Sequence, residues 1–418
     1  MRPARGRTLV GLGVGLVAAG AAAAAGVTAD RLLRARQTAL ALDTADTYEE
    51  PADEVIEVVA DDGVRLHVEI DHPQTLPQTA PADEGGPASR ARSNGKARSI
   101  GAEVPAEVMP TVVFSHGYTL SLRSWVFQRR ALKAAGYRVV LWDQRGHGRS
   151  GAGSAESYEV DQLGRDLARV IDRAVPEGPI VLVGHSMGGM TMMALAVEHH
   201  ALIRERVIGA AFVATSPGGL STVSWGLGNA LGKVVHRVGP AAVGRLVERD
   251  GLVASARRAG RDLEEFLVDR YSFASPVPLN IVRLTADMIF GTRMEVISHL
   301  LPAFDRHDKR EALEQFNGVE TLVLNGAQDL LTPPSHSDEI VRLIPGSEHV
   351  VVNEAGHIIM LEHPDVVSEQ LLSLVERAVR AGAQNVDVTR KPHVRRTVTD
   401  LAKQRRVNRA QSSRRNVS

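Results

Sequence analysis

Residues 180–190 constrain the fold of this 418-residue chain more than any other stretch. They read Ile-Val-Leu-Val-Gly-His-Ser-Met-Gly-Gly-Met, and the apolar residues at each end predict a buried strand followed by a helix over 190–197. Gly184 and Gly188 lie two positions either side of Ser186. A sharp strand-to-helix turn strains the backbone of such a serine and leaves no room for side chains at those two positions. The pattern predicts an exposed, oriented serine at the carboxyl end of a sheet; a glycine-rich turn with an incidental serine is the structural alternative.

Strands and helices alternate along most of the chain, which predicts an α/β fold with a mostly parallel sheet and helices on both faces. Residues 54–60 and 64–70 flank the turn signal Asp61-Asp62-Gly63 and predict an antiparallel hairpin. The other expected strands are 111–115, 138–142, 180–183, 207–214, 321–324 and 349–352. The expected helices include one that ends at 135 and those at 160–174, 190–197, 334–343 and 361–381.

Three segments depart from this alternation within or after an expected sheet domain of residues 51–382. Residues 72–110 are rich in Pro, Ala, Gly, Ser and charge, which indicates a flexible surface insertion. Residues 216–316 combine helical pieces, glycines and apolar residues, and predict a mostly helical subdomain inserted in the sheet domain. Residues 383–418 are rich in Arg and Lys and have no apolar periodicity. We therefore expect a solvated, disordered tail, with attachment to anionic lipid as the alternative.

Residues 1–50 are expected to form an N-terminal leader. Within it, residues 8–29 are uncharged and consist mostly of Gly, Ala, Val and Leu, a length that suits a membrane span or a secretory signal. Arginines lie on both flanks, at 2, 5, 7, 31, 34 and 36, so the charges do not decide the orientation. We expect membrane association or a place in the cell envelope; a soluble Ala-rich helix or a disordered leader is the alternative.

The composition excludes several kinds of site. The chain has no cysteine, which excludes disulfides, thiolate metal ligands and cysteine nucleophiles. No Asp, Glu or His set has metal-ligand spacing and the glycines of 143–151 lack the phosphate-binding G-x-x-x-x-G-K pattern, so we expect no metal and no nucleotide cofactor. Cationic and acidic residues both number 49 and no aromatic residue accompanies the C-terminal cations, so no nucleic-acid partner is expected.

A reactive serine needs a base, a carboxylate that orients the base, and donors for the oxyanion. Asp329 follows the expected strand 321–324, and His357 follows the expected strand 349–352, so both lie at the carboxyl edge of the sheet. These strands would be neighbours, which makes an Asp329–His357 hydrogen bond geometrically reasonable. Asp143 also follows a strand, but it precedes the serine in a glycine-rich loop, and we interpret it as structural.

Other candidates fit the chemistry less well. Glu354 lies on the same loop as His357, too close in sequence to aim easily at its ring. His116, His147 and His185 adjoin glycines, and we interpret them as residues that shape loops rather than move protons. His199 and His200 end an expected helix and are interpreted as a solvated cap.

Five segments in this order resemble the α/β-hydrolase fold family, in its serine esterase and lipase branch. They are Phe114-Ser-His-Gly117, Asp143-Gln-Arg-Gly-His-Gly-Arg-Ser150, Gly184-His-Ser-Met-Gly188, Gly326-Ala-Gln-Asp329 and Ala355-Gly-His357. The order Ser186, Asp329, His357 is that of the family. The resemblance implies a cofactor-free hydrolase whose backbone N–H groups at Tyr118 and Met187 form the oxyanion hole, with 216–316 as its helical cap.

The serine itself selects among branches of this family. Members that open epoxides or remove halogens use an aspartate at this position, so Ser186 favours acyl transfer. We expect hydrolysis of a small-molecule carboxylic ester with a lipophilic acyl group, since the cap region contains many apolar residues. A thioesterase, a carbon–carbon bond hydrolase and a haloperoxidase-like perhydrolase are the enzymatic alternatives. A non-catalytic ligand-binding or scaffold protein on the same fold is the alternative from another class.

Overall fold

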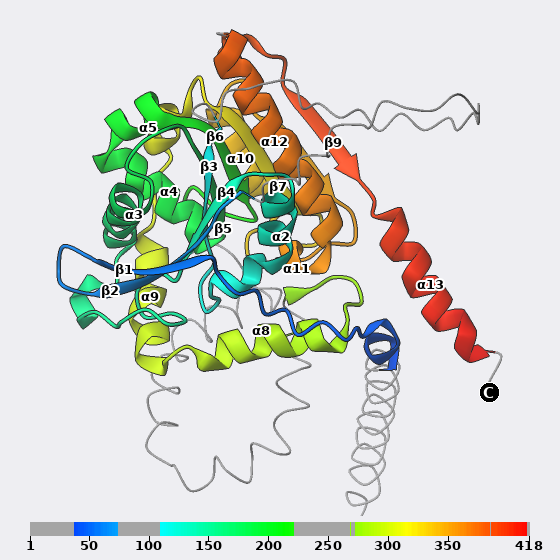
Figure 1. The fold of residues 1–418 in the computed structure, drawn as a ribbon. Coiled ribbons are helices and arrows are strands. Elements are labelled where there is room, and N and C mark those ends of the chain that lie inside the picture. Colours follow the sequence, from blue (N-terminus) through cyan, green and yellow to red (C-terminus); the bar gives the residue numbers. More distant parts are fainter. Residues whose placement is uncertain (1–36, 74–108, 221–267, 269–271, 385, 416–418) are drawn as a thin grey trace, which may run out of the picture.

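The computed structural model describes residues 37–73, 109–220, 268, 272–384 and 386–415, and a single nine-stranded sheet forms its centre (Figure 1). The strand order is β1-β2-β4-β3-β5-β6-β7-β8-β9. β2 pairs antiparallel with β1 and β4, and every other pair is parallel. The α/β fold with a mostly parallel sheet is thereby confirmed, as is the hairpin at its start.

The strands are β1 (Glu54–Val59), β2 (Arg65–Asp71), β3 (Thr111–Ser115), β4 (Arg138–Trp142), β5 (Ile180–His185), β6 (Val207–Val213), β7 (Glu320–Gly326), β8 (Glu348–Val352) and β9 (Val394–Val398). The α-helices named in Figure 1 or in the text are α2 (Val126–Ala134), α3 (Val160–Ala174), α4 (Met187–Glu198), α5 (His200–Arg206), α8 (Leu279–Gly291), α9 (Met294–Arg306), α10 (Pro334–Leu343), α11 (Ile359–Glu362), α12 (Pro364–Gln384) and α13 (Leu401–Arg415). Short 3-10 helices are η2 (Leu122–Trp125), η3 (Ala155–Ser157), η5 (Glu311–Phe316) and η6 (Val388–Arg390).

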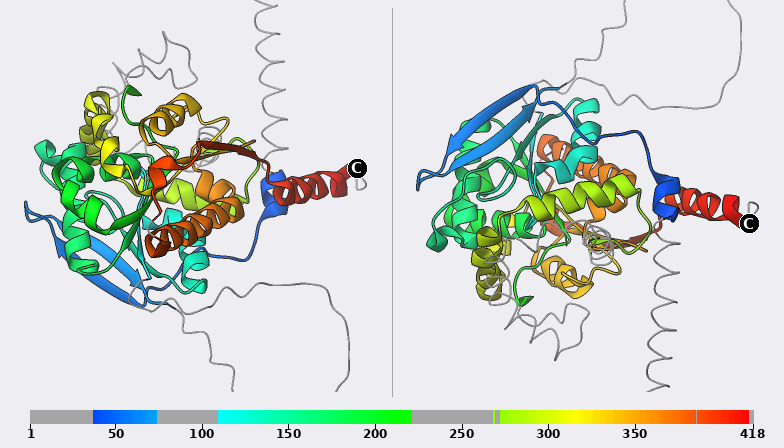
Figure 2. Two further views of the ribbon diagram at one scale, coloured as in Figure 1. Left: turned by 90° about the horizontal axis from the view of Figure 1, so that it is seen from above. Right: turned by 90° about the horizontal axis from the view of Figure 1, so that it is seen from below.

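The central strands are buried on both faces, as expected for strands made almost wholly of apolar residues. Side chains alternate along β3, so that Val112 and Phe114 pack in the layer of α2 and α12, whereas Val113 packs in the layer of α3 and α4. Seen from above and from below, these helix layers lie on opposite sides of the strands (Figure 2). This three-layer arrangement of helices, sheet and helices holds the carboxyl ends of the parallel strands at one common edge.

The described part of the predicted cap is helical. α8, α9 and η5 lie between β6 and β7 in the chain, and α8 runs across the end of the sheet toward which the parallel strands point (Figure 1). Residues 221–267 of the cap lie outside the described residues, as do residues 74–108 of the predicted insertion.

The predicted boundary of the N-terminal leader at residue 50 is wrong, because residues 37–50 belong to the packed domain. Residues 37–42 are helical, the hydroxyl of Tyr48 donates to Asn280 Oδ1 at 3.1 Å, and the ring of Tyr48 lies edge-on to Phe127. Residues 1–36, and with them the predicted membrane segment 8–29, lie outside the described residues. Within the residues that are described, no helix has the length and apolarity to cross a membrane.

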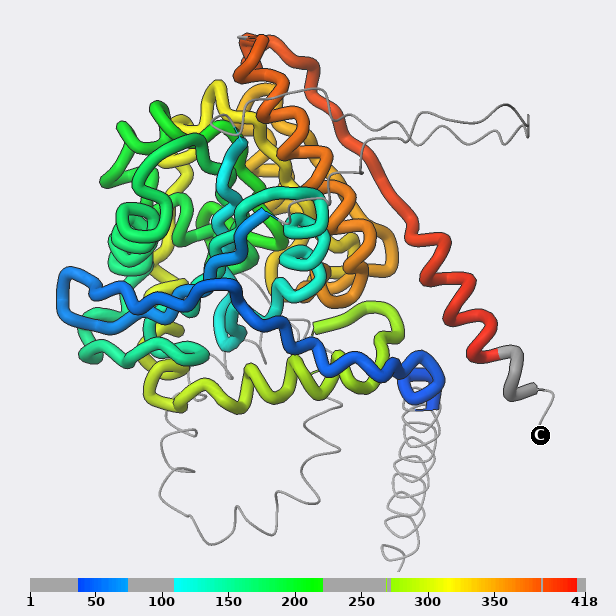
Figure 3. Tube along the Cα trace, in the orientation of Figure 1, coloured from blue at the N-terminus to red at the C-terminus, as the bar shows by residue number. Residues whose placement is uncertain are grey.

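The expectation of a disordered tail over 383–418 is wrong for residues 386–415. Residues 383 and 384 finish α12, and the chain then turns back along the sheet edge to form β9 and α13 (Figure 3). β9 pairs with β8, and carboxylates at this edge accept its cations: Arg395 pairs with Asp338 at 2.9 Å, and Arg396 pairs with Glu348. A basic composition by itself predicts solvation, whereas in the structure acidic residues far away in the sequence neutralise part of this charge.

Candidate active site

Ser186 lies on the sharp turn between β5 and α4. Its backbone angles, φ 51° and ψ −115°, are strained for a residue with a side chain. A Cβ on Gly188 would lie 2.2 Å from the Ser115 carbonyl oxygen, and one on Gly184 would lie 2.5 Å from Gly188. Sterics therefore require glycine on both sides, as the pattern predicts, and the serine remains partly exposed at the start of α4.

Asp329 and His357 meet in the loops that follow the neighbouring strands β7 and β8. His357 Nδ1 lies 2.9 Å from Asp329 Oδ2, and both side chains are almost completely buried. Because a carboxylate oxygen only accepts, this hydrogen bond places the imidazole proton on Nδ1 and leaves Nε2 as the basic atom. The predicted pairing of these two residues is present in the structure.

Asp329 is itself held by a residue that the sequence reasoning missed. Thr332 Oγ1 donates to Asp329 Oδ2 at 2.9 Å, while the backbone N–H groups of Leu331 and Thr332 donate to Oδ1 at 2.8 and 2.9 Å. The Thr332 hydroxyl also lies 3.3 Å from His357 Nδ1. A threonine three residues after an aspartate in a loop is the local signal that could have indicated this contact.

The backbone of His357 is fixed at three consecutive points. The N–H of Gly356 donates to Glu362 Oε2 at 2.6 Å, and the N–H of Ile358 donates to the Ser272 carbonyl at 3.0 Å. The carbonyl of His357 accepts from His185 Nε2 at 2.9 Å, and the two imidazole rings lie 4.8 Å apart between centroids. Since His185 directly precedes Ser186, this contact brings the serine turn and the histidine loop together.

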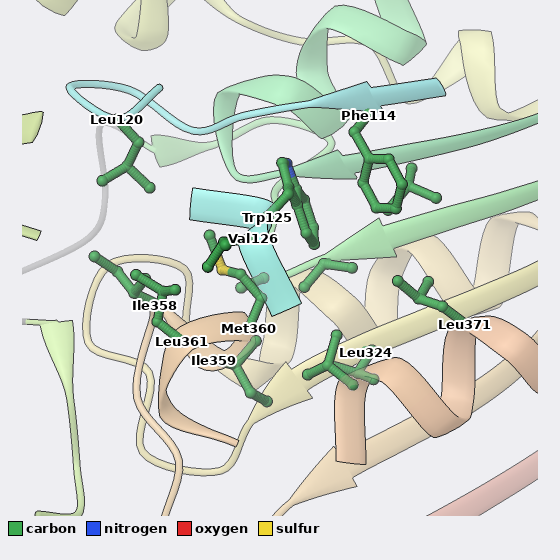
Figure 4. Packing of buried hydrophobic residues seen from close by; sticks show 14 of the residues in the cluster. Phe114, Leu120, Trp125, Val126, Leu324, Ile358, Ile359, Met360, Leu361 and Leu371 are labelled. Carbon is green, nitrogen blue, oxygen red and sulfur yellow. The ribbon is translucent and has the colours of Figure 1, made fainter. Parts of the chain in front are cut away.

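The residues that follow His357 are anchored in the core. Ile358 to Leu361 lie with Trp125, Val126 and Leu324 in one apolar cluster (Figure 4). This burial fixes the chain on the carboxyl side of His357, where α11 begins.

The backbone N–H groups of Tyr118 and Met187 lie on the two segments beside the serine. Gly117 adjoins Ser186 so closely that a Cβ on Gly117 would lie 3.3 Å from the Ser186 Cβ. His116 Nδ1 donates to the Gly117 carbonyl at 2.7 Å, and the N–H of a trans peptide points away from its carbonyl. His116 therefore sets the direction of the Tyr118 N–H. Met187 is the first residue of α4, whose N–H has no acceptor within the helix.

The buried histidines around the serine are hydrogen-bonding groups in their neutral form. Burial lowers the pKa of His116 to about 4 and that of His147 to about 3, and it holds the pKa of His185 well below its usual value. His116 Nε2 accepts from the Gln144 N–H at 2.9 Å while Nδ1 donates, which requires a neutral ring. These contacts agree with the interpretation of the three residues as shapers of loops.

The rival carboxylates are engaged elsewhere. Asp143 accepts from the N–H groups of Leu122 and Arg149 at 2.8 and 2.9 Å, and burial raises its pKa. The carboxylate of Glu354 accepts from Gln404 Nε2 at 3.0 Å. Among the residues that the structure describes, no group of three or more His, Asp or Glu side chains could hold a metal ion.

The cap supplies an apolar wall beside the serine turn. Met187 is buried in one cluster with Tyr158, Leu163, Val296 and Leu300, the last two from α9. Tyr118 packs on this cluster, and its hydroxyl donates to the Ile297 carbonyl at 2.6 Å. Both residues with candidate oxyanion N–H groups thus contact the cap through their side chains.

Comparison with known proteins identifies the family. Residues 110–364 match the family model described as the alpha/beta hydrolase fold. The chain belongs to this family. The matched α/β-hydrolase region includes all three residues of the Ser186, Asp329, His357 set, and it ends before β9 and α13.

Relatives of this α/β hydrolase differ in their reactions. It is 28% identical over 284 residues to the dihydrolipoyllysine-residue acetyltransferase component of an acetoin cleaving system from Pseudomonas putida. This alignment covers 66% of each chain. It is 26% identical to an sn-1-specific diacylglycerol lipase from Mus musculus, over 64% of this chain and 81% of the lipase. An esterase from Exiguobacterium antarcticum shares the fold at 19% identity with a TM-score of 0.55, over 77% of this chain and all of the esterase.

Proposed function

We propose that this protein is a serine hydrolase that cleaves carboxylic esters through Ser186, His357 and Asp329. The observation that carries the proposal is the buried 2.9 Å pair of Asp329 and His357, joined through the His185–His357 contact to a serine on a strained turn. Nucleophile, base and orienting carboxylate are the three parts that acyl transfer by a serine requires.

The expected reaction forms and hydrolyses an acyl-enzyme. Ser186 Oγ attacks the ester carbonyl while His357 Nε2 takes its proton, and the N–H groups of Tyr118 and Met187 stabilise the oxyanion. His357 then returns the proton to the leaving alkoxide, and the alcohol departs. Water attacks the acyl group by the same route, while Asp329 holds the ring and stabilises its positively charged form.

The apolar surroundings favour a lipophilic acyl group. Tyr118 and Phe304 are partly exposed and pack on the buried cluster of Met187, Val296 and Leu300, so an acyl chain that lies against them would exchange contacts with water for apolar contacts. The diacylglycerol lipase among the relatives is consistent with such a substrate.

Labelling with a fluorophosphonate probe tests the reaction type. We expect the folded protein to form one adduct, located on Ser186 by mass spectrometry, and the Ser186→Ala variant to form none. Ser216→Ala is the matched control, because Ser216 Oγ lies 2.7 Å from His336 Nδ1 yet is completely buried. A wild-type protein that does not react would refute the proposal. For a protein that reacts, p-nitrophenyl esters of graded chain length, with a thioester and a lactone beside them, would define the substrate.

The proposed location is a membrane, through residues 8–29. Their uncharged composition and length support it. Full-length protein is expected in the membrane fraction, and a variant lacking residues 1–36, which keeps the packed residues 37–50, in the soluble fraction. Recovery of both in the soluble fraction would contradict membrane association.

A further inference from the structure

Glu362 connects the histidine loop to the base of the cap. Its carboxylate is completely buried, and Oε2 accepts from the Gly356 N–H at 2.6 Å. Oε1 accepts from the N–H of Ala274 at 2.9 Å and from both the N–H and the hydroxyl of Ser275 at 2.6 Å. One carboxylate therefore satisfies donors from two segments that are distant in sequence, directly beside His357.

Lys403 extends this network to the C-terminal helix. Its Nζ donates to Ser275 Oγ at 2.6 Å and to the Glu362 carbonyl at 2.8 Å, and it lies 4.0 Å from Glu362 Oε1. Ser275 thus accepts from the lysine and donates to the glutamate. Lys403 is only 8% exposed, whereas most other described side chains of α13 are exposed or half-buried. A buried ammonium group is costly unless it is paired and hydrogen-bonded, as this one is.

The segment before α13 holds the other end of the same loop. The Asn353 N–H donates to the Val398 carbonyl at 2.8 Å, and Asn353 Nδ2 donates to Thr399 Oγ1 at 2.9 Å. His363 Nδ1 lies 3.2 Å from Asp400 Oδ2, and its Nε2 lies 3.1 Å from the Glu354 carbonyl. Residues 353–358, which include His357, therefore contact the C-terminal segment directly at Asn353 and are linked to it at Gly356 through Glu362.

We propose that residues 398–404, the C-terminal brace, hold the loop of the catalytic histidine in place, with Lys403 as a positioning residue that acts through Ser275 and Glu362. The inference rests on the proposed function for its effect on turnover. It assigns a role to a segment beyond residue 364, where the match to the family model ends. Small displacements of a catalytic base reduce the rate strongly, so a brace on its backbone would affect kcat more than KM.

The test compares Lys403→Met with Arg405→Met. Methionine keeps an apolar stem but removes the ammonium group that donates both hydrogen bonds, and Arg405 is an exposed cation on the same helix. In Lys403→Met we expect severalfold faster amide hydrogen exchange in peptides that cover 353–358, and a kcat about tenfold lower at an unchanged KM. Arg405→Met should match the wild type in both measurements.

Ser275 distinguishes an effect through the network from a general loss of stability. Ser275→Ala should reproduce the Lys403→Met effect, Ser275→Thr should restore most of the rate because it keeps a hydroxyl, and the double variant should lose no more than either single variant. Unchanged exchange over 353–358 in Lys403→Met, or additive losses in the double variant, would overturn the brace. Absence of fluorophosphonate labelling in the wild type would refute the proposed function alone, since the exchange measurement decides the brace without turnover.

Discussion

The serine turn and the histidine loop lie side by side, but different interactions hold them. The turn at Ser186 is restricted by close packing at two glycines: a Cβ on Gly184 would meet the backbone of Gly188, and a Cβ on Gly188 would meet the backbone of Ser115 at the end of β3. The loop at His357 depends on partners from the cap base, from α11 and from the C-terminal segment. The turn of the nucleophile thus depends on backbone packing at two glycines, whereas the position of its base depends on hydrogen bonds between distant parts of the chain.

The largest expected effect is on the chemistry that both regions share. Ser186→Ala and His357→Ala should each lower kcat/KM for an ester substrate about a thousandfold or more, since removing one residue of a catalytic unit costs nearly as much as removing the whole unit. Steady-state hydrolysis of a p-nitrophenyl ester measures kcat/KM. The double variant should be no worse than the single variants; a further loss of similar size would mean that the two residues do not act as one unit.

The close packing of the glycines at the serine turn predicts a steric response. Gly188→Ala would place a Cβ 2.2 Å from the Ser115 carbonyl oxygen, so the backbone must shift, and we expect a loss of about 1–3 kcal/mol in the free energy of unfolding. Denaturant unfolding measures the loss. The control is Gly382→Ala in α12, where a Cβ meets no atom within 4 Å. Equal stability of the two variants would contradict the steric account.

The dependence of His357 on hydrogen bonds around Asp329 predicts a response to a single hydroxyl. Thr332→Val keeps the shape of the side chain and both backbone donors but removes the hydrogen bond to Asp329 Oδ2. We expect kcat to fall about tenfold, since a hydrogen bond to a charged group is worth about 1.5 kcal/mol. Among the described residues the Thr285 hydroxyl donates to the Ile281 carbonyl within α8, so Thr285→Val should leave kcat unchanged. An unaltered rate in Thr332→Val would show that the backbone donors suffice.

The smallest expected effect concerns the pH dependence of stability at the C-terminal brace. Burial lowers the pKa of Lys403 to about 8, against the opposing influence of Glu362, Asp400 and Glu354, while Arg406 lowers it further. Above pH 8 the Lys403 side chain therefore keeps its proton in the unfolded chain but loses it in the folded chain. The free energy of unfolding of the wild type, relative to that of Lys403→Met, should rise with pH. We expect a gain of about 1 kcal/mol between about pH 8 and about pH 9. Chemical denaturation at each pH measures it, and a relative stability that falls with pH would contradict the assignment.

The sequence predicted those parts of the fold that rest on local patterns. The strands β1 to β8 lie within a few residues of their predicted ranges because alternating or continuous apolar runs identify them, and Asp329 and His357 are predicted together because parallel neighbouring strands end at one edge. The tail was predicted wrongly because β9 is a short, exposed edge strand with three polar residues, which has no clear pattern of its own. Its pairing with β8 depends on an edge and on carboxylates that other elements provide.

By itself the sequence determined the strand–turn–helix at Ser186, the order of the candidate catalytic residues and the family they point to, since each depends on spacing along the chain. Only the tertiary structure decided that Glu362 and Lys403 join the histidine loop to the cap base and the C-terminal helix, because their polar groups have partners that are distant in the chain. A buried hydrogen bond has no periodic signature, and its geometry exists only after the sheet, the cap base and the C-terminal segment have come together.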